Sequence, residues 1–120
     1  MKFRKGVLLM GIFMALSGCA SHTVQSYQGQ EPKLDLKEYF NGPIKAWGIV
    51  QDRSGKVIQR FDVSMVGSWD GDTGTLKEHF EYYDGKIQER TWTITRIADN
   101  HYEGTAGDII GTADGNISGN

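Results

Sequence analysis

The sequence has one cysteine, two prolines and few basic residues outside its first positions. The scarcity of cysteine and of basic residues excludes certain kinds of stabilisation and of binding partner. A single cysteine excludes a disulfide within the chain, so stability has to come from a packed core. Three of the 13 basic residues lie in the first five positions and all 15 acidic residues lie beyond residue 18, so residues 19–120 carry a net charge of −5. This balance argues against nucleic acid as a partner and against attachment to anionic lipid through basic side chains.

The first 18 residues are typical of an export signal. Basic side chains precede an apolar stretch from Gly6 to Leu16, which is too short to span a bilayer as a helix. The stretch ends in Leu16-Ser17-Gly18-Cys19, where a branched apolar residue and two small residues precede cysteine, as in the lipobox of bacterial lipoproteins. We therefore predict cleavage before Cys19 and attachment of acyl chains such as palmitate to it. Two or more acyl chains anchor a protein stably, so Cys19 would hold the protein on its membrane.

Residues 19–33 comprise the lipidated cysteine and a polar segment rich in Ser, Gln and Gly, which we interpret as a tether. Ala20 and Ser21 follow the cysteine, with no aspartate at these positions. By resemblance to lipoproteins of bacteria with two membranes, this favours the outer membrane, with the protein facing the periplasm. The remaining segment, 34–120, is predicted to form one domain, because a chain of this length suffices for one small core.

The domain is predicted to be all-β. Residues 34–40 could form one or two helical turns, ended by Asn41-Gly42-Pro43. Beyond them apolar residues recur at every second position, most clearly from Phe61 to Trp69. Further strands are predicted over 44–51, 75–82, 86–97 and 101–106. The short connections join antiparallel neighbours, which predicts an up-and-down meander in a lipocalin-like barrel or a strongly curved sheet.

The turns also predict the register of the strands. We place Gly55 and Gly85 at the left-handed positions of three-residue loops. The predicted cross-strand neighbours are then Trp47–Phe61, Trp69–Leu76, Met65–Phe80, Leu76–Trp92 and Glu78–Arg90. One face collects the apolar side chains, including all three tryptophans: Trp47, Phe61, Val63, Met65, Trp69, Leu76, Phe80, Tyr82, Trp92 and Ile94.

The last part of the sequence reads as an incomplete end. Residues 104–120 are rich in glycine, and Ile109, Ile110 and Ile117 suggest further strand fragments. Five strands are few for a closed barrel, which typically needs about eight. We therefore expect the domain to be truncated at its C-terminus relative to a longer protein.

Short motifs along residues 34–92 carry a family resemblance. They include Leu34-Asp35-Leu36, Tyr39-Phe40, Gly42-Pro43, Ala46-Trp47-Gly48, Trp69-Asp70-Gly71, Gly74-Thr75-Leu76, Asp84-Gly85 and Trp92. In these motifs the chain resembles a family of bacterial lipoproteins catalogued as domain of unknown function 3833. The resemblance implies envelope localisation and a longer chain, but no activity. The order of a helical turn followed by a meander is also similar to lipocalin-like calycins. Gly67-Ser68-Trp69 matches their Gly-x-Trp motif, but it lies on the second predicted strand, whereas that motif belongs on the first. We interpret this match as coincidence.

Glu78 and Arg90 are the most informative polar pair, because the predicted register places both on the apolar face. Arg90 could hold a carboxylate or phosphate headgroup inside a ligand cavity. The alternative, which we favour, is a cross-strand salt bridge at a barrel mouth. The aromatic set of Trp47, Trp69 and Trp92, with Phe80, could line a pocket for an acyl chain or form ordinary core.

The sequence shows no pattern for metal, cofactor or catalysis. Asp70-Gly71-Asp72-Thr73-Gly74 begins like a calcium loop, but Thr75 stands where such a loop needs glycine, so the segment predicts a turn. His22, His79 and His101 are scattered without metal-ligand spacing. We therefore expect a non-enzymatic protein without metal or cofactor.

Two functions follow as hypotheses. The first is a lipid-anchored protein that binds an apolar or amphiphilic ligand inside its β domain. The alternative is an envelope scaffold or accessory protein that binds a protein partner through its outer face, with contributions from Arg60, Lys77, Glu81, Lys86 and Glu89.

Overall fold

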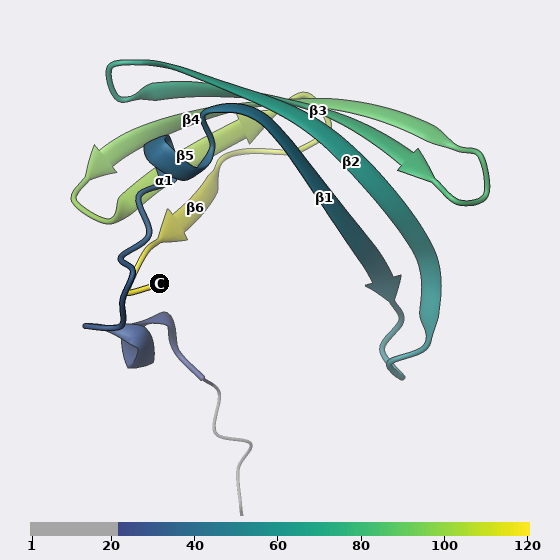
Figure 1. The fold of residues 1–120 in the computed structure, drawn as a ribbon, viewed down its shortest axis with the longest axis horizontal. Coiled ribbons are helices and arrows are strands. Elements are labelled where there is room, and N and C mark those ends of the chain that lie inside the picture. Colours follow the sequence, from purple (N-terminus) through teal and green to yellow (C-terminus); the bar gives the residue numbers. More distant parts are fainter. Residues whose placement is uncertain (1–21) are drawn as a thin grey trace, which may run out of the picture.

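The computed structural model describes residues 22–120 as a single curled sheet with short helical segments at its N-terminal end (Figure 1). The predicted export signal and Cys19 lie outside the described residues. The elements are the 3-10 helix η1 (Val24–Tyr27), the helix α1 (Leu36–Tyr39) and the strands β1 (Gly42–Gln51), β2 (Val57–Asp70), β3 (Thr73–Tyr82), β4 (Ile87–Ala98), β5 (His101–Ala106) and β6 (Ala113–Asn116).

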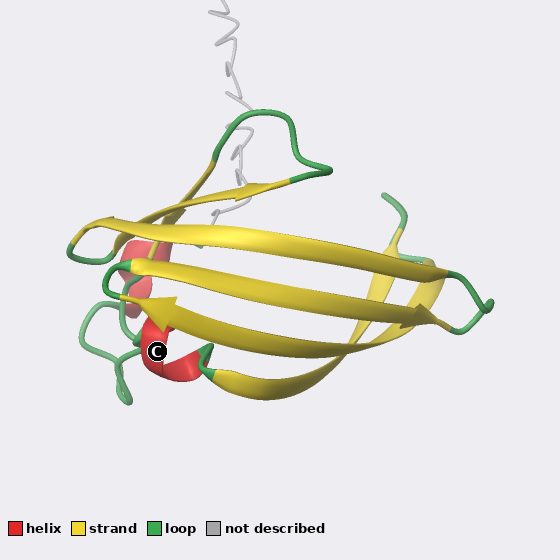
Figure 2. Cartoon of the chain, turned by 90° about the horizontal axis from the view of Figure 1, so that it is seen from above, coloured by secondary structure: helices red, strands yellow, loops and turns green. Residues whose placement is uncertain are grey.

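The six strands form one antiparallel sheet in sequence order, β1-β2-β3-β4-β5-β6. Figures 1 and 2 show that this sheet curls into a half-barrel with a concave and a convex face. The predicted all-β antiparallel meander in a curved sheet is therefore confirmed. β6 lies in the segment for which strand fragments were predicted, between Ile110 and Ile117 rather than on them.

Local chemistry explains the turns. Gly55 and Gly85 have φ values of 86° and 90°, which favour glycine, and each occupies the predicted three-residue loop. Asp52 Oδ1 accepts hydrogen bonds from the backbone N–H groups of Ser54 and Lys56, at 2.8 and 3.1 Å. These bonds satisfy donors in the loop that the ladder leaves free.

The helical turn predicted before the sheet is also present. Asp35 Oδ1 caps α1 by accepting a hydrogen bond from the backbone N–H of Glu38 at 3.0 Å. The helix gives way to Gly42, whose φ is 80°, and then to Pro43. Among residues 22–120, no helix is long and apolar enough to cross a membrane.

The register between β3 and β4 is the one predicted, with Leu76 opposite Trp92 and Glu78 opposite Arg90. Between β2 and β3 the predicted partners are wrong by two residues, since Trp69 pairs with Gly74 and not with Leu76. Asp70 pairs directly with Thr73, so the connection is tighter than expected. A shift by two residues keeps every side chain on its predicted face. The turn predicted at this connection, in place of a calcium loop, is present.

The predicted position of Trp47 is wrong, because a β-bulge lies between β1 and β2. Val50 pairs with Gln59 and Gln51 with Val57, which leaves Ile58 as an extra residue on β2. A slip of one residue turns each side chain of β1 to the other face. Trp47 therefore pairs with Asp62 and is 70% exposed on the convex face, while Gly48 lies opposite Phe61.

The core lies on the concave face, over β2 and β3. Four apolar side chains are buried there, namely Val63, Met65, Leu76 and Phe80. Partly buried apolar residues surround them: Phe40, Ile44, Ala46, Phe61, Tyr82, Trp92 and Ile94. Apart from Trp47, the predicted apolar set lies on this face.

The segment around Phe40 closes one end of the core. The indole Nε1 of Trp69 donates a hydrogen bond to the Phe40 carbonyl oxygen at 3.0 Å. The same oxygen would lie only 1.8 Å from a Cβ atom at position 67, so only glycine lets the two backbones approach this closely. Further along, the backbone N–H of Leu34 donates to the Gly119 carbonyl at 2.8 Å, which ties the N-terminal and C-terminal ends of the described segment together.

Candidate functional site

A row of charged side chains crosses the concave face. Glu78 of β3 and Arg90 of β4 are cross-strand partners, and Asp108 lies beside them in the loop 107–112 between β5 and β6. Arg90 Nε lies 3.1 and 3.0 Å from the two carboxylate oxygens of Asp108, and Nη2 lies 2.8 Å from Oδ2. Glu78 Oε2 lies 3.8 Å from Arg90 Nη1. One guanidinium therefore serves two carboxylates, and it holds Asp108 through two nitrogens.

Aromatic rings hold this guanidinium in place. Its central carbon lies 5.5 Å from the centre of the Phe80 ring and 6.0 Å from that of Trp92. Phe80 also packs edge-on against Phe61, with ring centres 5.4 Å apart. Arg90 thus lies against two aromatic rings on a strand that is paired on both sides, with its charged end on the concave side.

A second polar link extends the row along the face. Tyr82 Oη donates a hydrogen bond to Gln88 Oε1 at 3.0 Å, and Gln88 Nε2 donates to Asp108 Oδ2 at 3.3 Å. Asp108 therefore receives hydrogen bonds from both Gln88 and Arg90. Polar donors from two positions of β4 converge on one partly exposed carboxylate.

Burial makes the charge of Glu78 costly. The Glu78 side chain is 12% exposed, and its buried Oε2 atom has no hydrogen-bond partner. Burial raises the pKa of Glu78, and the nearby positive charge of Arg90 opposes this rise. The hydrogen bond from Arg90 lowers the pKa of Asp108. Arg90 thus interacts with a solvent-side carboxylate that stays ionised and with a buried one that is easier to protonate.

An open apolar hollow of about 230 Å³ lies on the same face, and it is lined in part by Trp92, whose ring centre is 6.0 Å from the Arg90 guanidinium. Its apolar lining includes Phe40, Leu76, Trp92, Ile94 and Tyr102, and its far side is formed by residues 113–115 of β6. Gly104 of β5 forms part of its floor, since a Cβ there would lie 3.3 Å from the Trp92 ring. The hollow offers apolar surface close to Arg90 and remains open to solvent.

The structure gathers only some of the predicted ligand-binding residues at this place. Phe80, Glu78, Arg90 and Trp92 lie together on adjacent strands. Trp69 lies farther along the concave face, where its ring covers Gly74. Trp47 lies on the opposite face, which removes it from any site on the concave side.

Asp108 is the residue that sequence reasoning missed. The available signal was the pairing of β4 with β5, in which Ala106 lies opposite Trp92. Extending this register by two residues brings position 108 beside Arg90. The strand ends at Ala106, as predicted, so Asp108 lies in a loop, where strand pairing alone does not assign a neighbour.

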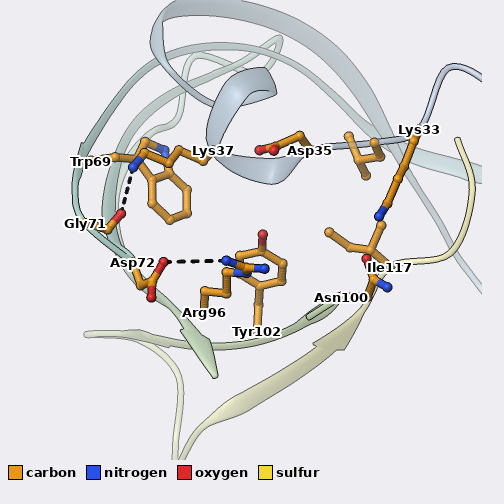
Figure 3. Close-up of a pocket in the computed structure, with 11 residues that line it drawn as sticks. Lys33, Asp35, Lys37, Trp69, Gly71, Asp72, Arg96, Asn100, Tyr102 and Ile117 are labelled. Carbon is orange, nitrogen blue, oxygen red and sulfur yellow. Dashed lines mark hydrogen bonds and ion pairs between the residues drawn. The ribbon is translucent and has the colours of Figure 1, made fainter. Parts of the chain in front are cut away.

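A separate cleft of about 300 Å³ lies at the end of the half-barrel, between α1 and the β2–β3 and β4–β5 turns (Figure 3). Charged and uncharged side chains share its lining, and several of the charged ones are paired with neighbouring groups. Lys37 Nζ donates a hydrogen bond to the Gly71 carbonyl at 2.9 Å, and Arg96 Nη1 lies 3.9 Å from Asp72 Oδ1. These pairs link α1 and β4 to the turn after β2, which favours a structural role.

The convex face has a different chemistry. The imidazole of His79 contacts Glu89 through Nδ1 and Glu81 through Nε2, the latter at 3.3 Å. The hydrogen bond with Glu89 raises the pKa of His79. The residues proposed to contact a partner are exposed: Arg60, Lys77, Glu81, Lys86 and Glu89. Across residues 22–120, no group of three or more His, Cys, Asp or Glu side chains is placed to hold a metal ion.

Comparison with the curated proteins and with the solved structures found no match. The sequence profile of the family described as "Protein of unknown function (DUF3833)" matches residues 13–120. The match includes every strand of the half-barrel and all residues of the charged row. The chain therefore belongs to this family of proteins of unknown function.

Proposed function

We propose that the protein binds an amphiphilic molecule on the concave face of its half-barrel, with the apolar part in the hollow beside Trp92. The observation that carries this proposal is the guanidinium of Arg90, which lies against the rings of Phe80 and Trp92, because Trp92 also lines the apolar hollow. This arrangement matches both parts of an amphiphile. A charged group binds an anionic headgroup through paired hydrogen bonds, and the apolar surface accepts a chain.

The energetics support such a ligand. Trp92 and Ile94 are only partly buried, so the concave face keeps apolar surface that a ligand could cover. Each methylene group that leaves water contributes about 0.8 kcal/mol when it is fully buried. The hollow is open, so a bound chain would gain less than this per group. A moderate affinity for single-chain amphiphiles follows.

We further propose that the protein works as a lipocalin-like lipoprotein of the cell envelope, anchored through Cys19 in the outer membrane and facing the periplasm. The lipobox Leu16-Ser17-Gly18-Cys19 supports the anchor, and the up-and-down order of the strands supports the likeness to lipocalins. A lipid anchor would keep the concave face close to a membrane, where amphiphilic molecules are abundant.

Quenching of tryptophan fluorescence by a brominated fatty acid tests the proposed binding. The full chain with Cys19→Ser, which cannot be lipidated, is titrated with bromododecanoic acid. We expect saturable quenching that Trp92→Phe largely removes and that the matched variant Trp47→Phe leaves in place, because only Trp92 lines the hollow. Quenching that does not depend on Trp92, or no quenching at all, would contradict ligand binding at this face.

The convex face supports a second candidate, a scaffold that binds a protein partner. Trp47 is 70% exposed and Tyr83 69% exposed on a surface that also carries exposed charges. Large exposed aromatic side chains are enriched at protein interfaces. A photo-crosslinking residue at position 47 should then capture one specific envelope protein in cells, and the same residue at position 61 on the concave face should not.

A further inference from the structure

We propose that Asp108 is a built-in competitor for the headgroup site, occupying Arg90 as the carboxylate of a single-chain amphiphile would. This inference rests on the proposed function and adds two features to it. It names a carboxylate as the preferred headgroup, and it makes the loop 107–112 a latch that the ligand displaces.

The contact geometry is the first argument. Asp108 presents both carboxylate oxygens to Arg90 Nε and Nη2 at 2.8 to 3.1 Å, the paired arrangement that a guanidinium forms with carboxylates in general. Gln88 Nε2 adds a further donor at 3.3 Å. The donors around Asp108 thus form a carboxylate-binding site whose occupant, in this structure, comes from the chain itself.

The second argument is the difference in how the two partners are held. Arg90 stands on β4, which is paired on both sides, and its guanidinium lies among the rings of Phe80 and Trp92. Asp108 stands on the loop 107–112 that leads to β6, the last strand of the sheet, and its side chain is 41% exposed. Glycines at positions 107 and 111 lie in the same loop, and Gly111 has a φ of 76°. Asp108 can therefore leave Arg90 without opening the core.

The third argument is the charge of the row. With Asp108 in place, one guanidinium faces two carboxylates, those of Asp108 and Glu78. A ligand carboxylate that replaces Asp108 leaves this count unchanged. A neutral headgroup would leave Arg90 with only Glu78 nearby, whose closest oxygen is 3.8 Å away and outside hydrogen-bond distance. The exchange therefore favours an anionic ligand over a neutral one of equal chain length.

A ligand carboxylate can bind only while Asp108 is away from Arg90. The apparent affinity is therefore the intrinsic affinity multiplied by the fraction of time that Arg90 is free. Removing the Asp108 charge should raise the affinity for a carboxylate amphiphile and leave a neutral one almost unaffected. The test uses the full chain with Cys19→Ser and three probes: dodecanoate, 1-dodecanol and acetate. Dissociation constants are measured by calorimetry, with Asp70→Asn as a control that makes the same change in net charge away from the site.

We expect Asp108→Asn to tighten dodecanoate binding about fivefold to tenfold and to change 1-dodecanol binding less than twofold. Arg90→Gln should weaken dodecanoate binding, and adding Asp108→Asn to it should then bring no gain. Acetate has no chain and should not compete at the concentrations used. A second variant, Asp108→Ser, repeats the test with a smaller side chain, and circular dichroism verifies that each variant is folded.

Three results would overturn the inference. The first is that folded Asp108→Asn and Asp108→Ser bind dodecanoate no more tightly than the parent, while the parent binds both amphiphiles. Asp108 would then be only a structural partner of Arg90, and the proposed function would stand. Competition by acetate as strong as that by dodecanoate would assign the site to small carboxylates instead of amphiphiles. Binding of neither amphiphile by any variant would remove the proposed function and this inference together.

Discussion

The concave and convex faces are built from the same strands, yet neighbouring titratable residues differ in burial and in hydrogen bonding between the two faces. Glu78 lies on the concave face, 12% exposed, with a buried oxygen that has no hydrogen-bond partner. His79, the next residue, lies on the convex face, 39% exposed, and contacts Glu81 and Glu89. The pKa of Glu78 is raised by burial, whereas that of His79 is raised by its hydrogen bond with Glu89.

The tryptophans show the same contrast. Trp92 contributes to the concave face, close to Arg90 and the hollow, whereas Trp47 is 70% exposed on the convex face. Trp92 lies between two threonines in an alternating segment, whereas Trp47 follows the apolar Ala46, so only Trp92 has its face marked by its neighbours. The curl of the sheet gives the two faces different surroundings, and the register decides which face each side chain reaches.

Truncation of an aromatic side chain should give the largest difference in stability between the two faces. We expect Phe80→Ala to lower the free energy of unfolding by about 3 kcal/mol, because Phe80 is buried and packs against Phe61. Trp47→Ala should change it by less than about 0.5 kcal/mol, because Trp47 lies on the convex surface. Urea denaturation of the Cys19→Ser chain measures both. A larger loss for Trp47→Ala than for Phe80→Ala would contradict the assignment of the faces.

The close approach of the Phe40 carbonyl to Gly67 should give the next largest effect on stability. Gly67→Ala places a methyl group on the Phe40 carbonyl oxygen, which also accepts the Trp69 hydrogen bond. We expect a loss of about 1–3 kcal/mol and an altered near-ultraviolet circular dichroism signal from Trp69. Gly107→Ala is the matched control, because a Cβ there meets no atom within 4 Å. Equal stability of the two variants would show that the segment around Phe40 does not pack on β2 as described.

The pH dependence of stability should show the smallest effect. The pKa of Glu78 is raised above its ordinary value of 4.5, so its contribution is fully present below pH 4.5 and is lost as the pH rises through the higher folded pKa. The pKa of His79 is raised above 6.5, so its contribution is present below pH 6.5 and is lost as the pH rises through its own folded pKa. Glu78→Gln should flatten the lower window and His79→Gln the upper one.

Thermal melts between pH 4 and pH 9 measure these windows. His22→Gln, which changes a histidine outside the sheet, serves as the control for His79→Gln. A loss of stability on acidification that disappears in Glu78→Gln would reverse the expected sign. It would show that Glu78 is held as a charged partner of Arg90 and is not disfavoured by burial.

The sequence predicted much of the fold, because a period of two assigns side chains to faces whatever the partner strand is. The alternation from Phe61 to Trp69 and the glycines at positions 55 and 85 correctly placed the concave face and two loops. The β2–β3 register was wrong by two residues without consequence for the faces. The bulge at Ile58 leaves no mark in the alternation of apolar residues, and a single extra residue was enough to turn Trp47 outward.

One feature of the sequence does explain the bulge in retrospect. The ring of Phe61 packs over Gly48, where an added Cβ would lie 2.3 Å from the ring. An aromatic side chain over a cross-strand glycine is a favourable pairing, and it requires Gly48 opposite Phe61. Apolar periodicity alone predicts Trp47 opposite Phe61, one position away from the observed partner.

By itself the sequence determined the class of fold, the pairing of Glu78 with Arg90 and membership of the family, because these depend on local periodicity, turn chemistry and motifs. The tertiary structure decided which tryptophans share the concave face and which carboxylate Arg90 binds. Both depend on contacts between distant segments. An extra residue on β2 shifts the whole of β1, and a loop 18 positions beyond Arg90 returns Asp108 to it. Such contacts arise only when the strands are assembled into one curved sheet.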